Sequence, residues 1–506
     1  MTASIGNWGG GYVTDVPYLP GYYRHQSPVH LNIACLLGGF CGLDLAGTPL
    51  SYLELGCGRG FGALALAVCN PCWRVNGIDF NPGPHRCRSS VRGRHREYPV
   101  YRGRFCHSDG RPERLRDPRS RRCHSTWSVE PGGRPCPPRD RPPACRQGPP
   151  GWRVQVSYNA LPAWLGALGT QRLLREAGEL LSVRSDRQVE AGLEVVHALA
   201  EAKAQHVAGL PFVDSLQQHV RHSQTAYLAH EYMTEAWRPC FHADVAAAMS
   251  EAKLDWVASD NLLENFSSLM LGEEARKVLA RFDDPVIREL VKDLCLPRGL
   301  RQDVFVRGAR RISPAERDDA LGKVMLGLLC SEPQLAWEFE VPSGHAALER
   351  RFFGPIAASL DHGPRFVGDL LALPDLPRRD NPGELVGMLV GSEQALPMLA
   401  APSDPDPRVI RFNRLAAKRF VHQENLNTGM ALATSGTGAP LPCPMLDLFV
   451  AARLEEEQTA DPASWTAMLG AGRPEDEQER LGEFVGRLIV ERAPIWRRLG
   501  GLSTGF

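Results

Sequence analysis

The stretch Ser51–Gly60, SYLELGCGRG, decides the expected fold, because a short apolar strand runs directly into a loop with glycine at every second position. The strand is Ser51–Leu55, and its apolar residues suit a buried place in a sheet. Gly56, Gly58 and Gly60 let the backbone turn sharply and approach a ligand closely. Apolar residues at helical spacing then predict a helix directly after the loop: Phe61, Leu64, Ala65 and Val68.

A second strand and an acidic residue follow this helix. Trp73–Ile78 is expected to form the strand, and Asp79 stands at its end. At about twenty residues beyond a glycine turn, a carboxylate can accept hydrogen bonds from both hydroxyls of a ribose. The order of strand, glycine turn, helix, strand and acid predicts half of a doubly wound nucleotide-binding fold. Ser27-Pro28 is a typical helix start, so a helix should precede the first strand.

Length and composition limit the number of domains, the kinds of partner and the cellular location that we expect. A chain of 506 residues exceeds what one core usually organises, so two or three domains are expected. Lysine plus arginine and aspartate plus glutamate balance at 58 each, so net charge indicates no nucleic acid, membrane surface or acidic substrate. The 14 cysteines match no small disulfide scaffold and no secretory leader opens the chain, so we expect a reduced, cytoplasmic protein. Leu31–Ala46 is too short and too interrupted by glycine to cross a membrane.

The chain changes character between about Gly83 and Pro150. Arginine makes up roughly a quarter of this segment, lysine and isoleucine are absent, and Leu115 is its only leucine. Such a composition cannot build a core, and the dense proline disfavours long helices and central strands. Globular patterning resumes at Trp152. The break lies inside the expected nucleotide-binding domain.

Three interpretations of this segment are open. It could be a disordered arginine-rich insertion that binds RNA or DNA. It could also be a zinc module, although the spacing of its candidate ligands is irregular: His85, Cys87, Cys106, His107, Cys123, His124, Cys136 and Cys145. The third interpretation is out-of-frame translation of a GC-rich gene between two compensating frameshifts. We favour the third, because the segment replaces the stretch that should hold the third and fourth strands.

Patterns beyond Pro162 predict two further units. Amphipathic helices dominate, and alternating residues in Leu254–Ala258 and Asp303–Val306 predict short strands among them. Helical patterns continue to the C-terminus past a proline-rich linker at Ala401–Pro407. We expect a Rossmann-like α/β domain whose sheet is incomplete because of residues 83–151, then an α+β domain and a mainly helical domain. The expected boundaries are 1–168, 169–330 and 331–506.

The glycine loop resembles the one by which class I methyltransferases hold S-adenosylmethionine. The pattern Glu54-x-Gly56-x-Gly58-x-Gly60 departs from the G-x-G-x-x-G spacing of NAD-dependent dehydrogenases, and Asn81-Pro82 follows Asp79 as in methyltransferases. The resemblance implies S-adenosylmethionine as cofactor, with loop N–H groups facing its carboxylate and Glu54 near its ammonium group. The implied cofactor-binding residues are Glu54, Gly56, Gly58, Gly60, Asp79 and Asn81.

Segments elsewhere resemble bacterial class I methyltransferases that carry a methyltransferase regulatory domain, a group that includes rickettsial-type protein lysine methyltransferases. The similarity extends over most of the chain apart from the arginine-rich segment. The matching runs that carry it include Gly11–Tyr18, Gly21–Arg24, Val156–Pro162, Tyr227–Tyr232 and Arg301–Gly308. The resemblance implies methyl transfer to a protein, with lysine as the expected acceptor. A protein substrate is therefore the expected partner, nucleic acid and membrane are not, and a homodimer is compatible with the pattern.

Methyl transfer requires in-line alignment of the acceptor atom, methyl carbon and sulfonium more than it requires a strong acid or base. A lysine must first lose a proton, which an aromatic pocket of low dielectric would assist. Tyr22, Tyr23 and Tyr158 are the catalytic candidates for its walls, and Asn159 is the candidate for a polar contact. Simple packing is the alternative for all four. No metal is expected.

Two other motifs are assigned structural roles. His230 and Glu231 could be an acid/base pair, but adjacent residues of a helix point in different directions and lie outside the expected catalytic domain. Cys69 and Cys72 form a C-x-x-C without a second pair at metal-binding spacing.

Two alternatives to an active methyltransferase are also open. If the arginine-rich segment is the true polypeptide, the sheet lacks the strands that position adenine and acceptor, and the chain would be a catalytically impaired remnant. An arginine-mediated nucleic-acid binder is the other alternative, and its affinity should fall steeply as salt rises.

Overall fold

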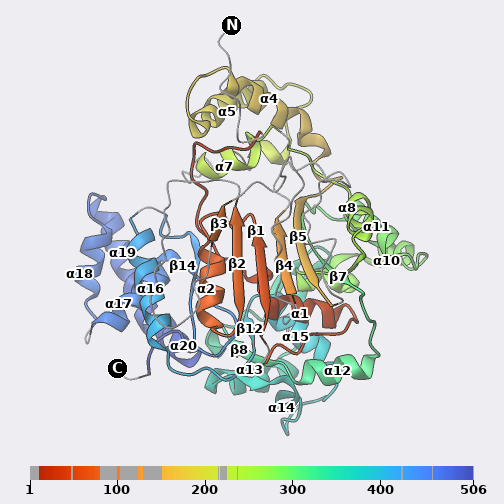
Figure 1. Ribbon diagram of the computed structural model, residues 1–506, viewed down its shortest axis with the longest axis vertical. Coiled ribbons are helices and arrows are strands. Elements are labelled where there is room, and N and C mark those ends of the chain that lie inside the picture. Colours follow the sequence, from red (N-terminus) through yellow and green to blue (C-terminus); the bar gives the residue numbers. More distant parts are fainter. Residues whose placement is uncertain are drawn as a thin grey trace.

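The structure is a computed structural model of the chain (Figure 1). It describes residues 11–46, 49–79, 100–102, 123–128, 151–214, 216, 225–235, 237–422, 425–457 and 460–504. Asn81 and most of the arginine-rich segment therefore lie outside the described residues, as do six of the eight candidate zinc ligands.

A seven-stranded sheet forms the centre of the molecule, in the order β3-β2-β1-β4-β5-β7-β6. Strands β1 to β5 run parallel, β7 is antiparallel to β5, and β6 is antiparallel to β7. The strands are β1 (Ser51–Leu55), β2 (Arg74–Asp79), β3 (Val100–Arg102), β4 (Cys123–Ser128), β5 (Arg153–Asn159), β6 (Leu254–Ser259) and β7 (Leu300–Arg307). Strand order reverses between β1 and β4, which is where doubly wound sheets bind ligands beyond the carboxyl ends of the strands.

The sequence predicted an incomplete sheet, and this prediction is wrong, because the backbone forms all the expected parallel strands. Strands β3 and β4 come from the arginine-rich segment and occupy the two places that had been expected to be vacant. Strand β4 pairs with β1, where Ser51 is opposite Cys123, and with β5, where His124 is opposite Arg153. Ladder hydrogen bonds join main-chain groups, so a strand can form in a segment whose composition does not predict one.

The strands predicted at 254–258 and 303–306 are present as β6 and β7, but they form no sheet of their own. Strand β7 pairs along its length with β5, from Arg153 opposite Val306 to Asn159 opposite Leu300. The expected boundary at residue 168 thus separates β5 from two strands of its own sheet. Alternation of apolar residues predicts a strand but not the sheet that it joins.

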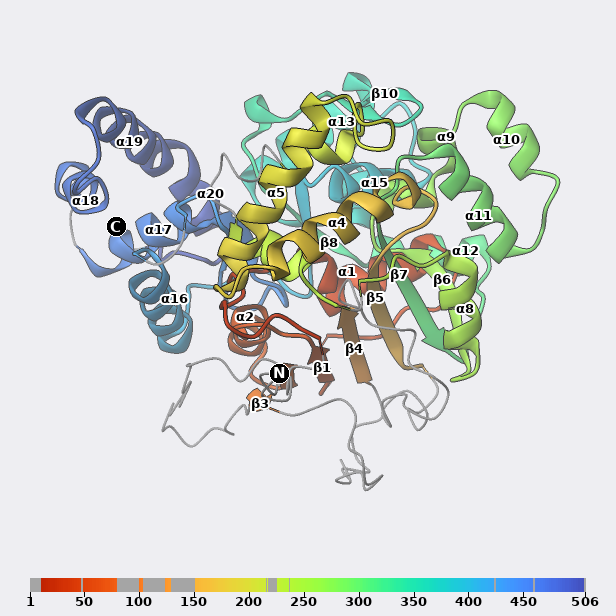
Figure 2. The ribbon, with the colours of Figure 1, turned by 90° about the horizontal axis from the view of Figure 1, so that it is seen from above.

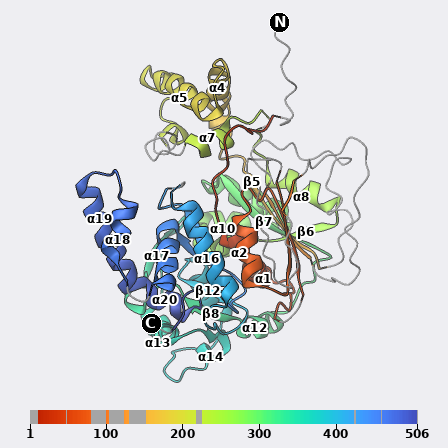
Figure 3. The same ribbon diagram turned by 60° about the vertical axis from the view of Figure 1, so that its left-hand side comes forward.

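Three of the helices between β5 and β6 form a cap above the carboxyl ends of the parallel strands, with α7 nearest the sheet (Figures 1 and 3). They are α4 (Leu168–Glu179), α5 (Ser185–Glu201) and α7 (Thr225–Tyr232). Leu174, Val189 and Leu228 are buried between them, together with Val16. Val16 belongs to the N-terminal run, which is the stretch of residues 11–27 before α1. The N-terminal run therefore packs against the cap.

A buried polar network anchors β7 to β5 and to two neighbouring helices, α8 (His242–Ser250) and α11 (Pro285–Cys295). Arg301 forms ion pairs with Glu289 at 2.9 Å, Asp293 at 2.7 Å and Asp303 at 2.8 Å. Tyr158 donates a hydrogen bond of 2.6 Å from its hydroxyl to Asp303. Each charge in this cluster has an opposite partner, which offsets the cost of burying it.

The C-terminal part is mainly helical, as predicted, with short strands among the helices. It packs against the helix that follows the glycine loop, because Phe61 of α2 (Phe61–Cys69) stacks on Phe412 of α16 (Pro407–Phe420), with centroids 5.7 Å apart. Figure 2 shows α16 beside α2. The other helices of this part are α13 (Arg350–His362), α14 (Val367–Leu371), α15 (Pro382–Gly391), α17 (Met445–Glu456), α18 (Pro462–Leu469), α19 (Glu475–Arg487) and α20 (Ala493–Arg498).

The remaining elements surround these parts. Met325–Leu328 (β8), Arg365–Phe366 (β11) and Ala395–Met398 (β12) form a three-stranded sheet. Two hairpins pair Glu338–Val341 (β9) with Gly344–Ala347 (β10) and Gly429–Leu432 (β13) with Leu441–Pro444 (β14). The helices not yet named are α1 (Pro28–Leu37), α9 (Ser267–Met270), α10 (Glu273–Leu279) and α12 (Pro314–Gly322). No described helix is long and apolar enough to span a membrane.

Candidate active site

The glycine loop after β1 has the backbone geometry that its sequence predicts. Gly56, Gly58 and Gly60 have φ angles of 77°, 54° and 75°, in the left-handed region that other residues rarely adopt. The N–H groups of Gly56 and Cys57 donate to the carbonyl of Ile78, at 2.8 and 3.2 Å. Three glycines are required because the loop enters the left-handed region at every second residue, and its hydrogen bonds hold it against the end of β2.

Asp79 and the glycine loop meet at the reversal point of the sheet. The N–H of Gly58 donates a hydrogen bond of 2.6 Å to the Oδ2 atom of Asp79. The predicted cofactor loop and the predicted ribose-binding acid are therefore in one place, although 21 residues separate them. A ribose hydroxyl bound by Asp79 would lie next to a loop with no side chains at its bends.

Glu54 is another predicted cofactor residue at this point, and it is 8 % exposed. Burial, reinforced by the nearby Asp79 carboxylate, raises the pKa of Glu54 to about 7. In the described part of the chain its buried Oε2 atom has no hydrogen-bond partner. A buried acceptor without a partner costs free energy, so a cationic ligand group at this position would be stabilising.

Aromatic residues from the N-terminal run and from α7 surround the loop. Tyr18 lies over Gly58, because a methyl group added to Gly58 would stand 3.4 Å from the Tyr18 ring. Tyr18 also makes an edge contact with His230 at 5.0 Å between centroids. Tyr23 is 53 % exposed, and desolvation together with the nearby Glu54 and Glu231 carboxylates raises the pKa of its phenol.

The cap completes the site through Glu231. Asn159, at the end of β5, donates a hydrogen bond of 3.0 Å from Nδ2 to Oε1 of Glu231 on α7. Tyr227 lies one helical turn before Glu231, and the pKa of its phenol is raised by desolvation and by the Glu231 carboxylate. His230 points elsewhere, with Nε2 2.8 Å from the carbonyl oxygen of Val16.

The structure thus brings some predicted site residues together and not others. Glu54, Gly56, Gly58, Gly60, Asp79, Tyr23 and Asn159 lie around the loop and the strand ends. Tyr22 is buried in the core beside Gly62 of α2, and Tyr158 is buried between β5 and α8 with its hydroxyl bound to Asp303. Tyr22 and Tyr158 therefore pack in the protein interior and do not form walls of a pocket at this site.

Two residues of the site, Tyr18 and Tyr227, were not proposed from the sequence, and a third, Glu231, had been assigned a structural role. The structural role assigned to His230 agrees with its contact to Val16, whereas Glu231 faces the end of β5. One feature of the sequence could have indicated that Tyr227 and Glu231 act together. They are four residues apart, and residues at this spacing share one face of a helix. Cys69 and Cys72 form no site in the described structure, because Cys69 is buried and Cys72 is exposed.

This fold and this site define a class I methyltransferase architecture. A family model described as a predicted methyltransferase regulatory domain matches residues 224–307. That span supplies α7 with Glu231, and both β6 and β7, so it completes the central sheet and one wall of the site.

Known proteins agree with this assignment. The structure of PKMT2 from Rickettsia typhi superposes with a TM-score of 0.61 at 14 % identity, over 95 % of this chain and 99 % of that one. A second structure of PKMT2 from Rickettsia typhi, in complex with AdoHcy, gives 0.60 at 13 % identity, over 96 % and 100 %. An uncharacterized protein of Synechocystis sp. is 28 % identical over 371 residues, 72 % of this chain and 71 % of the relative. The resemblance to methyltransferases with a regulatory domain is confirmed.

Proposed function

We propose that this chain transfers a methyl group from S-adenosylmethionine to a lysine side chain of a protein. The observation that carries the proposal is the 2.6 Å hydrogen bond between the Gly58 N–H and the Asp79 carboxylate, which joins the two predicted halves of a cofactor site. The related fold of PKMT2 from Rickettsia typhi was solved in complex with AdoHcy, which supports this choice of cofactor.

The residues around the glycine loop fit a ligand with an ammonium, a carboxylate and a ribose. Glu54 would accept from the ammonium through its unpartnered Oε2 atom. The α2 helix begins at Phe61 directly behind the loop, and the N–H groups at a helix start suit a carboxylate. Asp79 would accept from the ribose hydroxyls. Bound in this way, S-adenosylmethionine would supply an electrophilic methyl group.

We assign the acceptor side of the site to Tyr23, Tyr227, Glu231 and Asn159. A lysine reaches the site as an ammonium, and the Glu231 carboxylate held by Asn159 would attract it. The exposed Tyr23 ring can contact the same cation through its face. After the ammonium loses a proton to water, the amine nitrogen bonds to the methyl carbon while the electron pair of the C–S bond stays on sulfur. The chain's own residues orient the amine for this step.

The division into a methyltransferase domain, a regulatory domain and a helical C-terminal domain is part of this proposal. The regulatory domain would act directly on the acceptor through α7, because Glu231 belongs to residues 224–307. A cytoplasmic location, a protein substrate and a homodimer remain predictions from the sequence.

Calorimetric titration with S-adenosylmethionine tests the proposal, using the full chain and the Gly58→Ala variant. We expect micromolar to submillimolar binding to the full chain and at least tenfold weaker binding to the variant. Methyl transfer is then measured by mass spectrometry as a gain of one methyl group on lysine-containing acceptor proteins. No binding at millimolar ligand would overturn the proposal and would favour an impaired remnant.

A further inference from the structure

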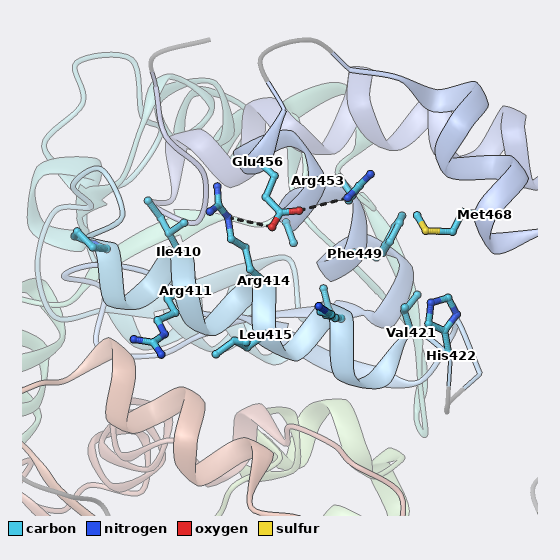
Figure 4. Close-up of a pocket in the computed structure, with 14 residues that line it drawn as sticks. Ile410, Arg411, Arg414, Leu415, Val421, His422, Phe449, Arg453, Glu456 and Met468 are labelled. Atoms are coloured by element: carbon cyan, nitrogen blue, oxygen red, sulfur yellow. Dashed lines mark hydrogen bonds and ion pairs between the residues drawn. The ribbon is translucent and has the colours of Figure 1, made fainter. Parts of the chain in front are cut away.

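A groove on the C-terminal part lies apart from the glycine loop and carries no assigned role. It has a volume of about 880 Å³ and runs between α16 and α17, with one residue of α18 at its edge (Figure 4). Its lining residues are Pro407, Ile410, Arg411, Arg414, Leu415, Ala417, Lys418, Val421, His422, Phe449, Ala452, Arg453, Glu456 and Met468. We call this surface the α16–α17 groove.

The groove is long enough to accommodate a helix. Lining residues recur every three or four positions along α16 and as far as Val421 just after it, so they form one face of that helix. At a helical rise of 1.5 Å per residue this face is about 20 Å long, which matches roughly four turns of a bound helix. Residues on α17 recur in the same way from Phe449 to Glu456.

The floor of the groove is apolar and partly open to solvent. Leu415 is 55 % exposed and Met468 is 38 % exposed, although both are large apolar side chains. Single exposed apolar residues are common on protein surfaces, but these two line one hollow together with Phe449. A partner with its own apolar face would remove this surface from water.

The rim of the groove is cationic. Four cationic side chains line it, Arg411, Arg414, Lys418 and Arg453, against the single carboxylate of Glu456. Figure 4 shows Glu456 between Arg414 and Arg453, with ion-pair distances of 3.7 and 3.4 Å. Within the described residues Arg411 and Lys418 have no ion pair, so their charge is available to a partner.

One end of the groove lies near the glycine loop, although no residue of that loop lines it. Phe420 ends α16 immediately before Val421 of the lining, and the Arg59 guanidinium lies 4.7 Å from the centre of the Phe420 ring. Arg59 stands between Gly58 and Gly60 in the glycine loop. A segment bound in the groove would therefore have one end near Arg59 of the glycine loop.

We propose that the α16–α17 groove binds an acidic, amphipathic helical segment of the protein acceptor. Apolar residues on one face of that segment fill the floor, and its carboxylates pair with Arg411 and Lys418. The assignment of this segment to the acceptor rests on the proposed methyltransferase function. Binding to the groove itself requires neither cofactor nor methyl transfer, so the two proposals can fail separately.

Fluorescence anisotropy with two labelled model peptides tests this proposal in the absence of cofactor. Both are 16-residue helices with leucine at one face, and the other positions carry glutamate in the first peptide and lysine in the second. We expect the glutamate peptide to bind the full chain at least tenfold more tightly, with affinity that falls as salt rises. Equal binding of the two peptides, or no binding of the glutamate peptide, would overturn the proposal.

Matched variants localise the binding. The double variant R411E/K418E should weaken binding of the glutamate peptide at least tenfold, and Leu415→Glu should also weaken it. The control R276E/R281E makes the same charge change at two exposed positions around α10, and Leu294→Glu controls for the loss of an exposed leucine. All variants should keep the melting temperature of the wild type within a few degrees. Unchanged affinity in R411E/K418E would place the peptide elsewhere and refute the assignment.

A methylation arm separates the two proposals. A peptide that joins the glutamate helix through a glycine-serine linker to a lysine is compared with the same peptide carrying a scrambled helix. Faster methylation of the first supports both proposals, and equal methylation of the two overturns the docking site alone. Groove binding without cofactor binding would overturn the methyltransferase function alone.

Discussion

Glu231 on α7 accepts a hydrogen bond of 3.0 Å from Asn159 at the end of β5, which joins the matched regulatory domain to the methyltransferase sheet. The two residues are 72 positions apart in the chain. This contact places a carboxylate from the regulatory domain beside the strand ends where the cofactor site is proposed. The segment that matches the regulatory-domain model therefore forms one wall of the candidate site.

Glu231→Gln should impair use of the acceptor and leave the cofactor unaffected. Glutamine keeps the shape of the side chain and an oxygen for Asn159, but it removes the charge that would attract an ammonium. A hydrogen bond to a charged group contributes about 1.5–3 kcal/mol, so kcat/KM for a protein acceptor should fall about 10- to 100-fold. Glu194→Gln, on the exposed side of α5, is the control. Equal kcat/KM in the variant and wild type would remove Glu231 from the acceptor site.

Affinity for S-adenosylmethionine should rise with pH because Glu54 must be ionised to accept from an ammonium. Its pKa in the free protein is about 7, so a minor fraction is ionised at pH 6 and most of it at pH 8. Affinity should increase about tenfold over this range, with uptake of protons by the buffer on binding. Calorimetry in buffers of different ionisation enthalpy measures both quantities. Glu54→Gln should bind more weakly and show no such pH dependence.

The same group predicts how stability without ligand depends on pH. The folded protein binds the Glu54 proton more tightly than the unfolded chain, because burial raises the pKa from 4.5 to about 7. The protonated Glu54 therefore contributes its whole stabilisation at pH values below the unfolded pKa. This stabilisation, of up to about 3 kcal/mol, is lost as the pH rises through about 7. The free energy of unfolding, measured with urea between pH 4.5 and 8, should fall more in the wild type than in Glu54→Gln. Parallel curves for the two proteins would contradict the burial of an ionising carboxyl.

Gly58→Ala should destabilise the loop, whereas Gly62→Ala should not. Position 58 has a φ of 54°, and a left-handed conformation costs an L-residue about 1–2 kcal/mol. An added methyl group there would also touch Tyr18 at 3.4 Å. Gly62 lies in the α2 helix, where an added methyl group would make ordinary contact with the carbonyl of Gly21 at 3.5 Å. Urea unfolding and cofactor titration should both separate the two variants, and equal effects would show that loop conformation is not the cause.

Arg301→Met should destabilise the protein by about 3–5 kcal/mol, because it leaves three buried carboxylates without their shared partner. These are Glu289, Asp293 and Asp303. Arg310→Met, which breaks an exposed ion pair with Glu316, should have a far smaller effect, because solvent screens exposed charges. The free energy of unfolding in urea measures both.

Acid should remove part of the stability that Arg301 supports. Although burial opposes it, the neighbouring cations Lys292, Arg301 and Arg298 lower the pKa of Glu289 to about 2. A carboxyl group whose pKa is lowered by folding stabilises the fold at pH values above its unfolded pKa, which is near 4.5. This stabilisation is lost as the pH falls toward 2. The wild type should therefore lose stability between pH 5 and 2, and Arg301→Met should lose less over the same range.

The amino-acid sequence by itself determined the glycine loop, because the geometry of that loop is local. Glycine at 56, 58 and 60, an apolar strand before them and a helix after them act over distances of a few residues, where φ angles and side-chain periodicity decide the conformation. Asp79 could be placed from its spacing because one helix and one strand separate it from the loop, and few folds allow that path.

Only the tertiary structure decided which distant residues meet. Strands β6 and β7 join β5, Tyr158 donates to Asp303 145 positions away, and Glu231 contacts Asn159 across the cap. Strands β3 and β4 complete the sheet through main-chain pairing that composition does not reveal. Helical or strand periodicity states which face of an element is buried but not against which neighbour, because that choice depends on packing of the whole chain.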